Sequence, residues 1–311
     1  MIVAITGGSG FIGRRLALRH LALGDEVRVL SRKCTGLPQA VTCCRGDLLE
    51  PDSLAGFVDK ADVLYHCAGQ LTDTALMKNL HVDGTRRLAG IASGNIGHWV
   101  QLSSVGVYGP VSSGLITENS PLRPSGVYET TKCESDRIVL DAAESGAFTC
   151  SILRPSNVFG GEMTNRSLFA MTRMIENRLF FFIGEPGASA NYIHVDNVVE
   201  ALVLCATLPR AKGRIYNLSD HRTMEQFAGA IAAALGRPSP RLRLPKEPVL
   251  WLGKLLGNMP GFPLTASRIN ALSNRAFYAA DAIRDELGYH HVISMEEGIR
   301  DLVEACKRKA N

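Results

Sequence analysis

The feature that most constrains the fold is a glycine-rich segment that directly follows a short apolar run near the start of the chain. Residues 2–5 are apolar, residues 6–13 read TGGSGFIG, and a helical pattern begins at Arg14. Between a strand and a helix, glycines at this spacing permit a tight turn and a close approach of the backbone to a pyrophosphate, which faces the helix N-terminus. The segment therefore predicts a dinucleotide site, and a glycine-rich turn without a ligand is the alternative. The predicted contacts are Gly7, Gly10, Phe11, Ile12 and Gly13.

Short apolar runs alternate with helical patterns through the first half of the chain. The expected strands are residues 2–5, 26–30, 63–66, 99–102 and 150–153, and helical patterns occupy residues 14–23, 54–58, 82–92 and 132–143. This alternation predicts an α/β fold, a Rossmann-type doubly wound parallel sheet with helices on both faces. Sheets of this kind bind their ligands at the carboxyl ends of the strands.

After Gly160 the pattern changes to longer helices and loops rich in proline and glycine. We predict a dinucleotide-binding domain over residues 1–160, to which residues 192–218 return as strand, helix and strand. Residues 161–191 and 219–311 are expected to form a smaller, discontinuous C-terminal substrate-binding lobe that closes with a helix near residues 295–307.

The end of the second expected strand bears on the choice of dinucleotide. Ser31, Arg32 and Lys33 stand where a site for NAD normally offers a carboxylate to the ribose. We therefore favour NADP(H), with Arg32 and Ser31 on the 2′-phosphate, while NAD(H) stays possible; the alternative is that the basic pair only solvates a loop. Asp47, followed by Leu48, could bind the adenine amine or cap the next helix.

A tyrosine and a lysine are spaced for proton transfer. Tyr128 and Lys132 are four residues apart, so on a helix they lie on one face about 5–6 Å apart. A nearby ammonium and the charge of the bound cofactor are together expected to lower the phenol pKa from about 10, which lets Tyr128 exchange a proton with a substrate hydroxyl. Ser104 ends an apolar strand and could hold the substrate oxygen, with Ser103 as the fallback. The alternatives are a packed tyrosine near a surface lysine, and serines that only cap the strand.

These segments together resemble the extended short-chain dehydrogenase/reductase family, which includes nucleotide-sugar epimerases, dehydratases and ketoreductases. The resemblance covers nearly the whole chain and rests on TGGSGFIG, GDL at 46–48, SSVGVYG at 103–109, YETTK at 128–132, LRPSNVFG at 153–160 and YIHVDNVVEAL at 192–202. It implies catalytic roles for Ser104, Tyr128 and Lys132. It further implies that Ala68, Gly69, Ser103, Pro155 and Asn157 lie at the cofactor, and that the substrate contacts are Ser104, Tyr128 and Asn157. Arg166, Arg173 or Arg268 could supply the substrate-binding cation that is missing at Ala190.

Three departures from the family pattern bear on the chemistry. His81 stands where the family commonly has asparagine, so it could substitute for that residue, be an ordinary helix residue or mark a changed proton path. Val105 and Gly106 replace the acid pair of sugar dehydratases, which argues against water elimination. Ala190 stands where many nucleotide-sugar enzymes have an arginine for the substrate pyrophosphate.

The resemblance implies an oxidoreductase that interconverts a secondary alcohol and a ketone, with a nucleotide sugar as the favoured substrate and ketone reduction favoured over epimerisation. The missing arginine keeps a second substrate class open, a steroid or dihydroflavonol, for which Phe180–Phe182, Trp251 and Leu252 could supply an apolar surface. Core packing is the more expected use of so many aromatic residues. A non-catalytic NADP-binding redox sensor is a third possibility. A homodimer is possible by analogy with relatives.

Composition excludes several other classes. The net charge is +4, from 34 basic and 30 acidic residues mixed along the chain, so nucleic acid is an unexpected partner. The apolar residues 249–256 are far short of the roughly 20 that a membrane span needs. The eight cysteines show no metal-binding spacing, and we expect no metal and reduced thiols. With no room for a charged leader before the glycine turn, a cytoplasmic protein is expected.

Overall fold

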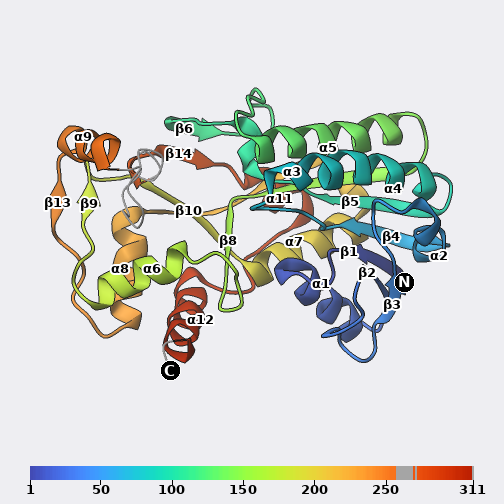
Figure 1. The fold of residues 1–311 in the computed structure, drawn as a ribbon, viewed down its shortest axis with the longest axis horizontal. Coiled ribbons are helices and arrows are strands. Elements are labelled where there is room, and N and C mark those ends of the chain that lie inside the picture. The colour runs from blue at the N-terminus through green and yellow to red at the C-terminus, as the bar shows by residue number, and fades with distance from the viewer. Residues whose placement is uncertain (257–268, 270–271, 310–311) are drawn as a thin grey trace.

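A computed structural model describes residues 1–256, 269 and 272–309, and it is organised around a sheet of seven parallel strands (Figure 1). The strand order is β3-β2-β1-β4-β5-β7-β11. These strands are β1 (Ile2–Thr6), β2 (Glu26–Ser31), β3 (Thr42–Arg45), β4 (Ala61–His66), β5 (Ile96–Leu102), β7 (Thr149–Pro155) and β11 (Ile215–Leu218). The predicted α/β fold with a Rossmann-type parallel sheet is confirmed.

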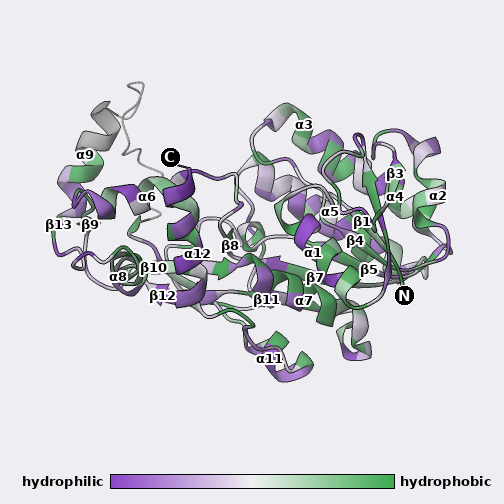
Figure 2. Cartoon of the chain, turned by 90° about the horizontal axis from the view of Figure 1, so that it is seen from below, coloured by the Kyte–Doolittle hydropathy of each residue, from purple (hydrophilic) through white to green (hydrophobic). Residues whose placement is uncertain are grey.

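Helices cover both faces of this sheet because the central strands are apolar on both sides. One face carries α1 (Phe11–Ala22), α7 (Val195–Thr207) and α11 (Asp281–Leu287). The other carries α2 (Ala55–Val58), α4 (Thr85–Ala92) and α5 (Val127–Glu144), with α3 (Thr74–Lys78) beside α5. Figure 2 shows mainly hydrophobic residues along these strands and α7. Short 3₁₀ turns lie at Pro51–Ser53, Val105–Tyr108 and Pro209–Ala211, and a π-helical turn at Asn79–Gly84 joins α3 to α4.

The smaller part of the molecule has its own apolar core, formed by residues such as Phe159, Phe227, Ile231, Ile299 and Leu302. Its strands are β8 (Asn157–Phe159), β10 (Ser189–His194) and β12 (Asp220–Thr223) in one sheet, and β9 (Phe182–Ile183) with β13 (Arg243–Leu244) in a second. A further pair joins β6 (Ser113–Ile116) to β14 (Arg275–Tyr278). The helices are α6 (Ser167–Glu176), α8 (Met224–Ala234), α9 (Lys246–Leu256) and α12 (Met295–Arg308).

Residues 192–218 are divided between the two parts, which differs from the expectation that they all return to the main sheet. Helix α7 packs on the main sheet and β11 extends it beside β7, whereas β10 pairs with β8 and β12. The apolar pattern of residues 192–194 predicts a buried strand, but it does not show which of the two sheets that strand joins.

The cysteine expectation was wrong at one pair, since Cys34 and Cys43 form a disulfide. The chain leaves β2 and returns along β3, which brings the two Cα atoms within 5.8 Å. The remaining six cysteines are free thiols. Irregular spacing along the sequence does not show such a pairing, because the pairing depends on how the loop folds back.

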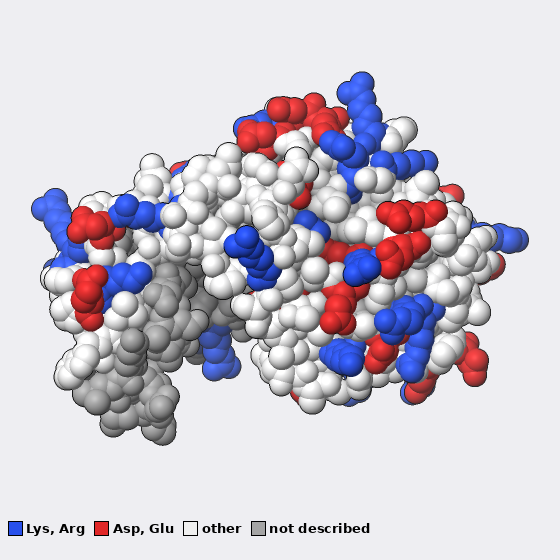
Figure 3. Space-filling model, turned by 90° about the horizontal axis from the view of Figure 1, so that it is seen from above, with Lys and Arg blue, Asp and Glu red and all other residues white. Residues whose placement is uncertain are grey.

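The surface carries charges of both signs. On the face drawn in Figure 3, acidic and basic side chains are interspersed. Among the described residues, no helix has both the length and the hydropathy to cross a membrane, and no group of three or more metal-ligating side chains is assembled.

Candidate active site

The glycine-rich turn between β1 and α1 leaves no space for side chains at two of its positions. Gly7 has a φ of +68°, and a Cβ atom there would lie 2.8 Å from the backbone of Ala68. A Cβ at Gly13 would lie 2.3 Å from the carbonyl oxygen of Gly7. Gly10 precedes the first residue of α1, and no side chain caps this end of the helix. The first N–H groups of α1 are therefore suited to bind an anion, and the turn fits a pyrophosphate.

The loop after β4 lies against this turn. The Thr6 hydroxyl accepts a hydrogen bond from the backbone N–H of Ala68 at 3.2 Å and contacts His66 Nδ1 at 2.8 Å. Ala68 and Gly69 thus lie beside the glycine turn at the carboxyl ends of β1 and β4, as expected for residues that flank a dinucleotide.

The residues predicted to contact the adenosine end follow β2 and β3. The Ser31 hydroxyl donates to the Lys33 carbonyl at 2.7 Å. Arg32 is exposed, and no hydrogen bond or ion pair within residues 1–256, 269 and 272–309 engages its guanidinium. Asp47 accepts a hydrogen bond from the Leu49 N–H at 3.0 Å, and Leu48 is buried. Arg32 is therefore available for an anionic ligand, while Asp47 already caps a turn.

Helix α5 and the end of β5 bring the phenol and a serine hydroxyl together. Tyr128 lies in the first turn of α5, and Ser104 caps the 3₁₀ turn that follows β5. Burial raises the pKa of Tyr128 to about 12, and a hydrogen bond from Ser104 works against that rise. The Ser103 hydroxyl instead donates to Asp136 at 2.7 Å. Of the two serines, Ser104 is the one that the structure brings to Tyr128.

The Lys132 ammonium donates to the carbonyl oxygen of Leu102 at 2.7 Å and is buried. Burial lowers the pKa of Lys132, and the nearby Asp136 carboxylate opposes this shift. The expected lowering of the Tyr128 pKa by Lys132 is not found: the groups that shift it, besides burial, are Ser104, Glu129 and Asp136. Desolvation of the phenolate outweighs the contribution of Ser104, and the negative charges of Glu129 and Asp136 raise the Tyr128 pKa further.

A buried network of hydrogen bonds and one ion pair lies next to Ser103 and Lys132. Asp136 pairs with the Arg154 guanidinium at 3.2 Å, and Arg154 donates to the Tyr108 hydroxyl at 3.1 Å. The Tyr108 hydroxyl in turn donates to Asn217 at 2.8 Å. This network ties α5 to β7 and β11 and fixes the direction of Ser103. The sequence alone did not reveal it, because its members are far apart along the chain.

Glu129 and His81 are two further residues whose placement the sequence did not show. The side chain of Glu129 packs over the turn after β5, where a Cβ added to Gly106 would lie 3.1 Å from its Cγ. A single carboxylate therefore lies near Ser104, although no acid pair follows that serine. The ring of His81 packs edge-on against Tyr128, with ring centroids 5.7 Å apart.

The remaining predicted residues follow β7. Pro155 ends that strand, and the side-chain amide of Asn157 donates to the Asn191 carbonyl at 3.2 Å. Arg166 is exposed at the N-terminus of α6, and Figure 1 shows α6 in the smaller part of the molecule, separate from α5. The structure therefore does not bring Arg166 to Tyr128. Arg268 lies outside the residues that the structure describes.

In the smaller part of the molecule, Ala190 stands where many nucleotide-sugar enzymes have an arginine. Ala190 is 1% exposed and lies opposite Arg222 in the β10–β12 pair. The Arg222 guanidinium is held by Asp220 at 2.6 Å. Phe180 and Phe182 are packed in the core, while Trp251 is largely exposed. Phe180 and Phe182 therefore have the core role expected for them and do not form a surface for an apolar ligand.

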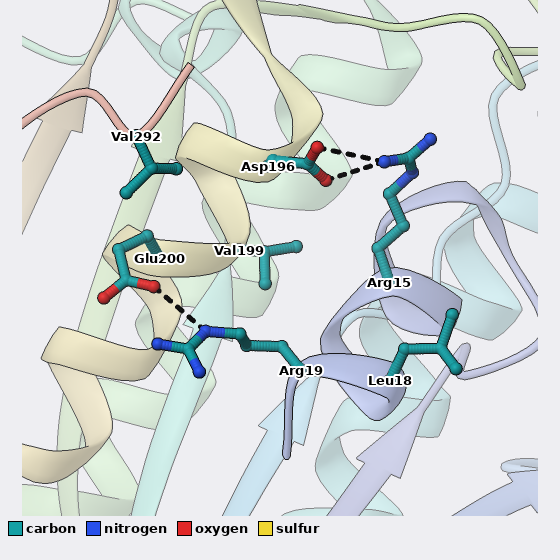
Figure 4. Close-up of a pocket in the computed structure, with 7 residues that line it drawn as sticks. All are labelled: Arg15, Leu18, Arg19, Asp196, Val199, Glu200 and Val292. Carbon is teal, nitrogen blue, oxygen red and sulfur yellow. Dashed lines mark hydrogen bonds and ion pairs between the residues drawn. The ribbon is translucent and has the colours of Figure 1, made fainter. Parts of the chain in front are cut away.

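A surface pocket of about 410 Å³ lies between α1 and α7 (Figure 4). Its charged residues pair with each other: Arg15 binds Asp196 at 2.8 Å, and Arg19 binds Glu200 at 3.2 Å. It lies on the sheet face opposite to α5 and offers no unpaired charge. The candidate site therefore remains the carboxyl edge of the sheet at β1, β4 and β5.

Comparison with known proteins identifies the family of the chain. Residues 3–219 match the model of the NAD dependent epimerase/dehydratase family. A 3 beta-hydroxysteroid dehydrogenase/Delta 5-->4-isomerase of Mycobacterium tuberculosis is 27% identical, with 96% of this chain and 88% of that protein covered. A 2-alkyl-3-oxoalkanoate reductase of Shewanella oneidensis is 25% identical, with 96% of this chain and 84% of that protein covered.

Solved structures share the fold. A UDP-glucose 4-epimerase from Thermotoga maritima superposes with a TM-score of 0.78 at 17% identity, with both chains covered completely. A short-chain dehydrogenase/reductase superfamily protein from Agrobacterium tumefaciens with bound NAD superposes with a TM-score of 0.78 at 19% identity, covering 100% of this chain and 98% of that chain. The chain belongs to the NAD dependent epimerase/dehydratase family, among the extended short-chain dehydrogenases/reductases, and is a nicotinamide-dependent enzyme.

Proposed function

We propose that the protein interconverts a secondary alcohol and a ketone with Tyr128 as the proton-transfer group, Ser104 as the hydrogen-bond donor to the substrate oxygen, and Lys132 as the positioning cation. The observation that carries this proposal is the placement of Tyr128, in the first turn of α5, next to Ser104, which follows β5 at the carboxyl edge of the sheet. Because the hydroxyls of Ser104 and Tyr128 lie next to each other, both can hydrogen-bond to the same substrate oxygen.

In ketone reduction, Ser104 and Tyr128 have different roles. When bound, the nicotinamide supplies the hydride. Ser104 donates to the carbonyl oxygen, and Tyr128 gives its phenolic proton to that oxygen as the carbonyl carbon is reduced. Because burial holds the pKa of Tyr128 at about 12, the phenol is protonated at neutral pH, which is the form that reduction requires. Oxidation runs through the same atoms in reverse, with the phenolate taking the proton.

We propose an apolar ketone or alcohol as the substrate, in preference to the nucleotide sugar favoured by the sequence resemblance. Ala190 offers no charge for a pyrophosphate, and the facing Arg222 is engaged by Asp220. Two aliphatic side chains near site residues in the sequence are open to solvent: Leu71, two residues after Gly69, is 66% exposed, and Val127, next to Tyr128, is 49% exposed. The hydroxysteroid dehydrogenases and the oxoalkanoate reductase among the relatives support this choice.

We further propose NADP(H) as the preferred dinucleotide, because the unpaired Arg32 guanidinium suits a 2′-phosphate and β2 ends without a carboxylate. Arg32→Ala should weaken NADPH binding about tenfold or more, the loss of one charge-assisted hydrogen bond, and change NADH binding by less than about twofold. Lys33→Ala is the neighbouring control. Equal weakening of both dinucleotides by Arg32→Ala would refute the preference.

The decisive experiment compares two partly buried tyrosines. Tyr128→Phe should lower the rate of NADPH-dependent ketone reduction by about 10²–10⁴-fold without changing NADPH affinity, because only the proton donor is removed. Tyr192→Phe, which alters a tyrosine stacked on Phe227 with a pKa also raised to about 12, should leave the rate unchanged. The assay panel contains a 3-ketosteroid, a 3-oxoalkanoate and a UDP-4-ketosugar. An unchanged rate in Tyr128→Phe would refute the mechanism, and turnover of the UDP-sugar alone would refute the substrate class.

A further inference from the structure

His81 bridges two segments of the candidate site. It lies in the π-helical turn Asn79–Gly84, and its side chain is 1% exposed. Its Nε2 atom is 2.8 Å from the backbone nitrogen of Gln70, in the loop after β4. Its Nδ1 atom is 2.8 Å from the Thr131 hydroxyl, in the first turns of α5. The ring therefore spans from the loop that carries Ala68 and Gly69 to the helix that carries Tyr128.

The directions of these hydrogen bonds determine where the ring proton lies. A backbone N–H can only donate, so Nε2 must accept and carries no proton. In the neutral ring the proton is then on Nδ1, which donates to the Thr131 oxygen. The Thr131 hydroxyl donates its own hydrogen bond to the backbone carbonyl of Val127 at 2.8 Å or of Tyr128 at 3.1 Å. Because the Gln70 N–H must donate to Nε2, only the neutral ring protonated at Nδ1 satisfies these bonds.

We propose that His81 is a positioning residue that, as the neutral Nδ1–H tautomer, holds the loop after β4 at a set distance from the first turn of α5. The inference rests on the proposed function, because that distance separates the backbone of Ala68 and Gly69 from the phenol of Tyr128. His81 then replaces the family's asparagine with a rigid link and does not carry a proton in the reaction.

Packing and charge around the ring agree with this role. A Cβ added at Gly69 would lie 3.6 Å from Nε2, so the loop rests directly on the ring. The edge of the ring meets Tyr128 at an interplanar angle of 80°. Burial first, and the Lys132 charge second, lower the pKa of His81 to about 4. The neighbouring His66 on β4 is also kept neutral, since burial lowers its pKa to about 3, so Lys132 is the cation that faces this ring.

Two substitutions each remove one half of the link. In His81→Asn the side-chain amide can reach the position of Nδ1 and donate to Thr131, but nothing accepts from the Gln70 N–H. In His81→Gln the side-chain oxygen can reach the position of Nε2 and accept from Gln70, but the bond to Thr131 is lost. Amide hydrogen exchange at Gln70 should speed up about tenfold in His81→Asn and stay near the wild-type rate in His81→Gln. Equal exchange rates in all three proteins would overturn the proposal, whether or not any substrate is found.

Turnover separates positioning from simple stability. Both His81 variants should lower kcat about tenfold or more for ketone reduction, with KM and NADPH affinity changed by less than about threefold, because a small misplacement acts on the reacting geometry. The matched control is His98→Gln, since His98 is also buried and bonded to Thr149 and Ser151 but lies in the first half of β5. It should lower the melting temperature similarly and leave kcat unchanged. Wild-type kcat in folded His81 variants would overturn the inference, whereas no turnover by wild-type protein would overturn the proposed function and leave the exchange result to judge His81.

Discussion

Acidification should destabilise this protein above the pH at which carboxylates titrate, because burial lowers the pKa of several of its histidines, three of them strongly. Burial lowers the pKa of His66 to about 3, and of His81 and His98 to about 4. In the unfolded chain each has a pKa of about 6.5, so unfolding takes up protons below pH 6.5 and stability falls as the pH falls. The loss continues until the pH reaches the folded-state pKa values near 4.

The magnitude follows from the proton count. At pH 5 each histidine is about 1.5 pH units below its unfolded pKa, which corresponds to about 2 kcal/mol at about 1.4 kcal/mol per unit. Three such residues remove about 6 kcal/mol, a large part of the about 5–15 kcal/mol that keeps a typical domain folded. Asp136 acts in the opposite direction, since burial raises its pKa and its protonation stabilises the folded state. A comparison of wild-type protein with a histidine variant cancels this opposing contribution, because Asp136 is present in both proteins.

Urea unfolding of wild-type protein and His98→Gln at pH 7.5, 6.5, 5.5 and 5.0 measures the effect. Wild-type stability should fall steeply from pH 6.5 to pH 5.0. The fall in His98→Gln should be smaller by about 2 kcal/mol, because one proton fewer is taken up on unfolding. Parallel pH profiles for the two proteins would show that His98 titrates normally in the folded state and would refute the reasoning.

Three further perturbations test other parts of the structure. Gly13→Ala places a methyl carbon 2.3 Å from a carbonyl oxygen of the turn and should abolish NADPH binding in a fluorescence titration, whereas wild-type affinity would exclude this turn as the site. Asp136→Ala leaves the Arg154 guanidinium buried without its carboxylate and should cost about 3–5 kcal/mol in urea unfolding; a loss below about 1 kcal/mol would contradict the buried pair. Dithiothreitol should lower the free energy of unfolding by about 2–3 kcal/mol through the Cys34–Cys43 disulfide, and an equal effect on Cys34→Ser would contradict this.

The parts of the site that could be predicted from sequence are those whose chemistry is local. The glycine turn needs only eight consecutive residues, and Tyr128 with Lys132 needs only one helical turn. The support of these groups could not be predicted, because Asp136 and Arg154 come from α5 and β7, and His81 meets Thr131 across 50 residues of sequence. The disulfide escaped prediction for the same reason. Which strand or loop a side chain meets is decided by packing, and a single sequence does not display it.

The protonation states of the site bear on the direction of the reaction. An active phenolate would require Tyr128 to lose its proton, and desolvation holds the pKa of this phenol near 12. The Lys132 ammonium, which could stabilise a phenolate, already donates one hydrogen bond to the Leu102 carbonyl. The chain by itself thus favours the proton donor over the proton acceptor. Under the proposed function, ketone reduction uses the state that already dominates at neutral pH, whereas alcohol oxidation must first ionise the phenol. The oxidation rate should therefore rise with pH over the range, below a pH of about 12, in which the reduction rate stays constant.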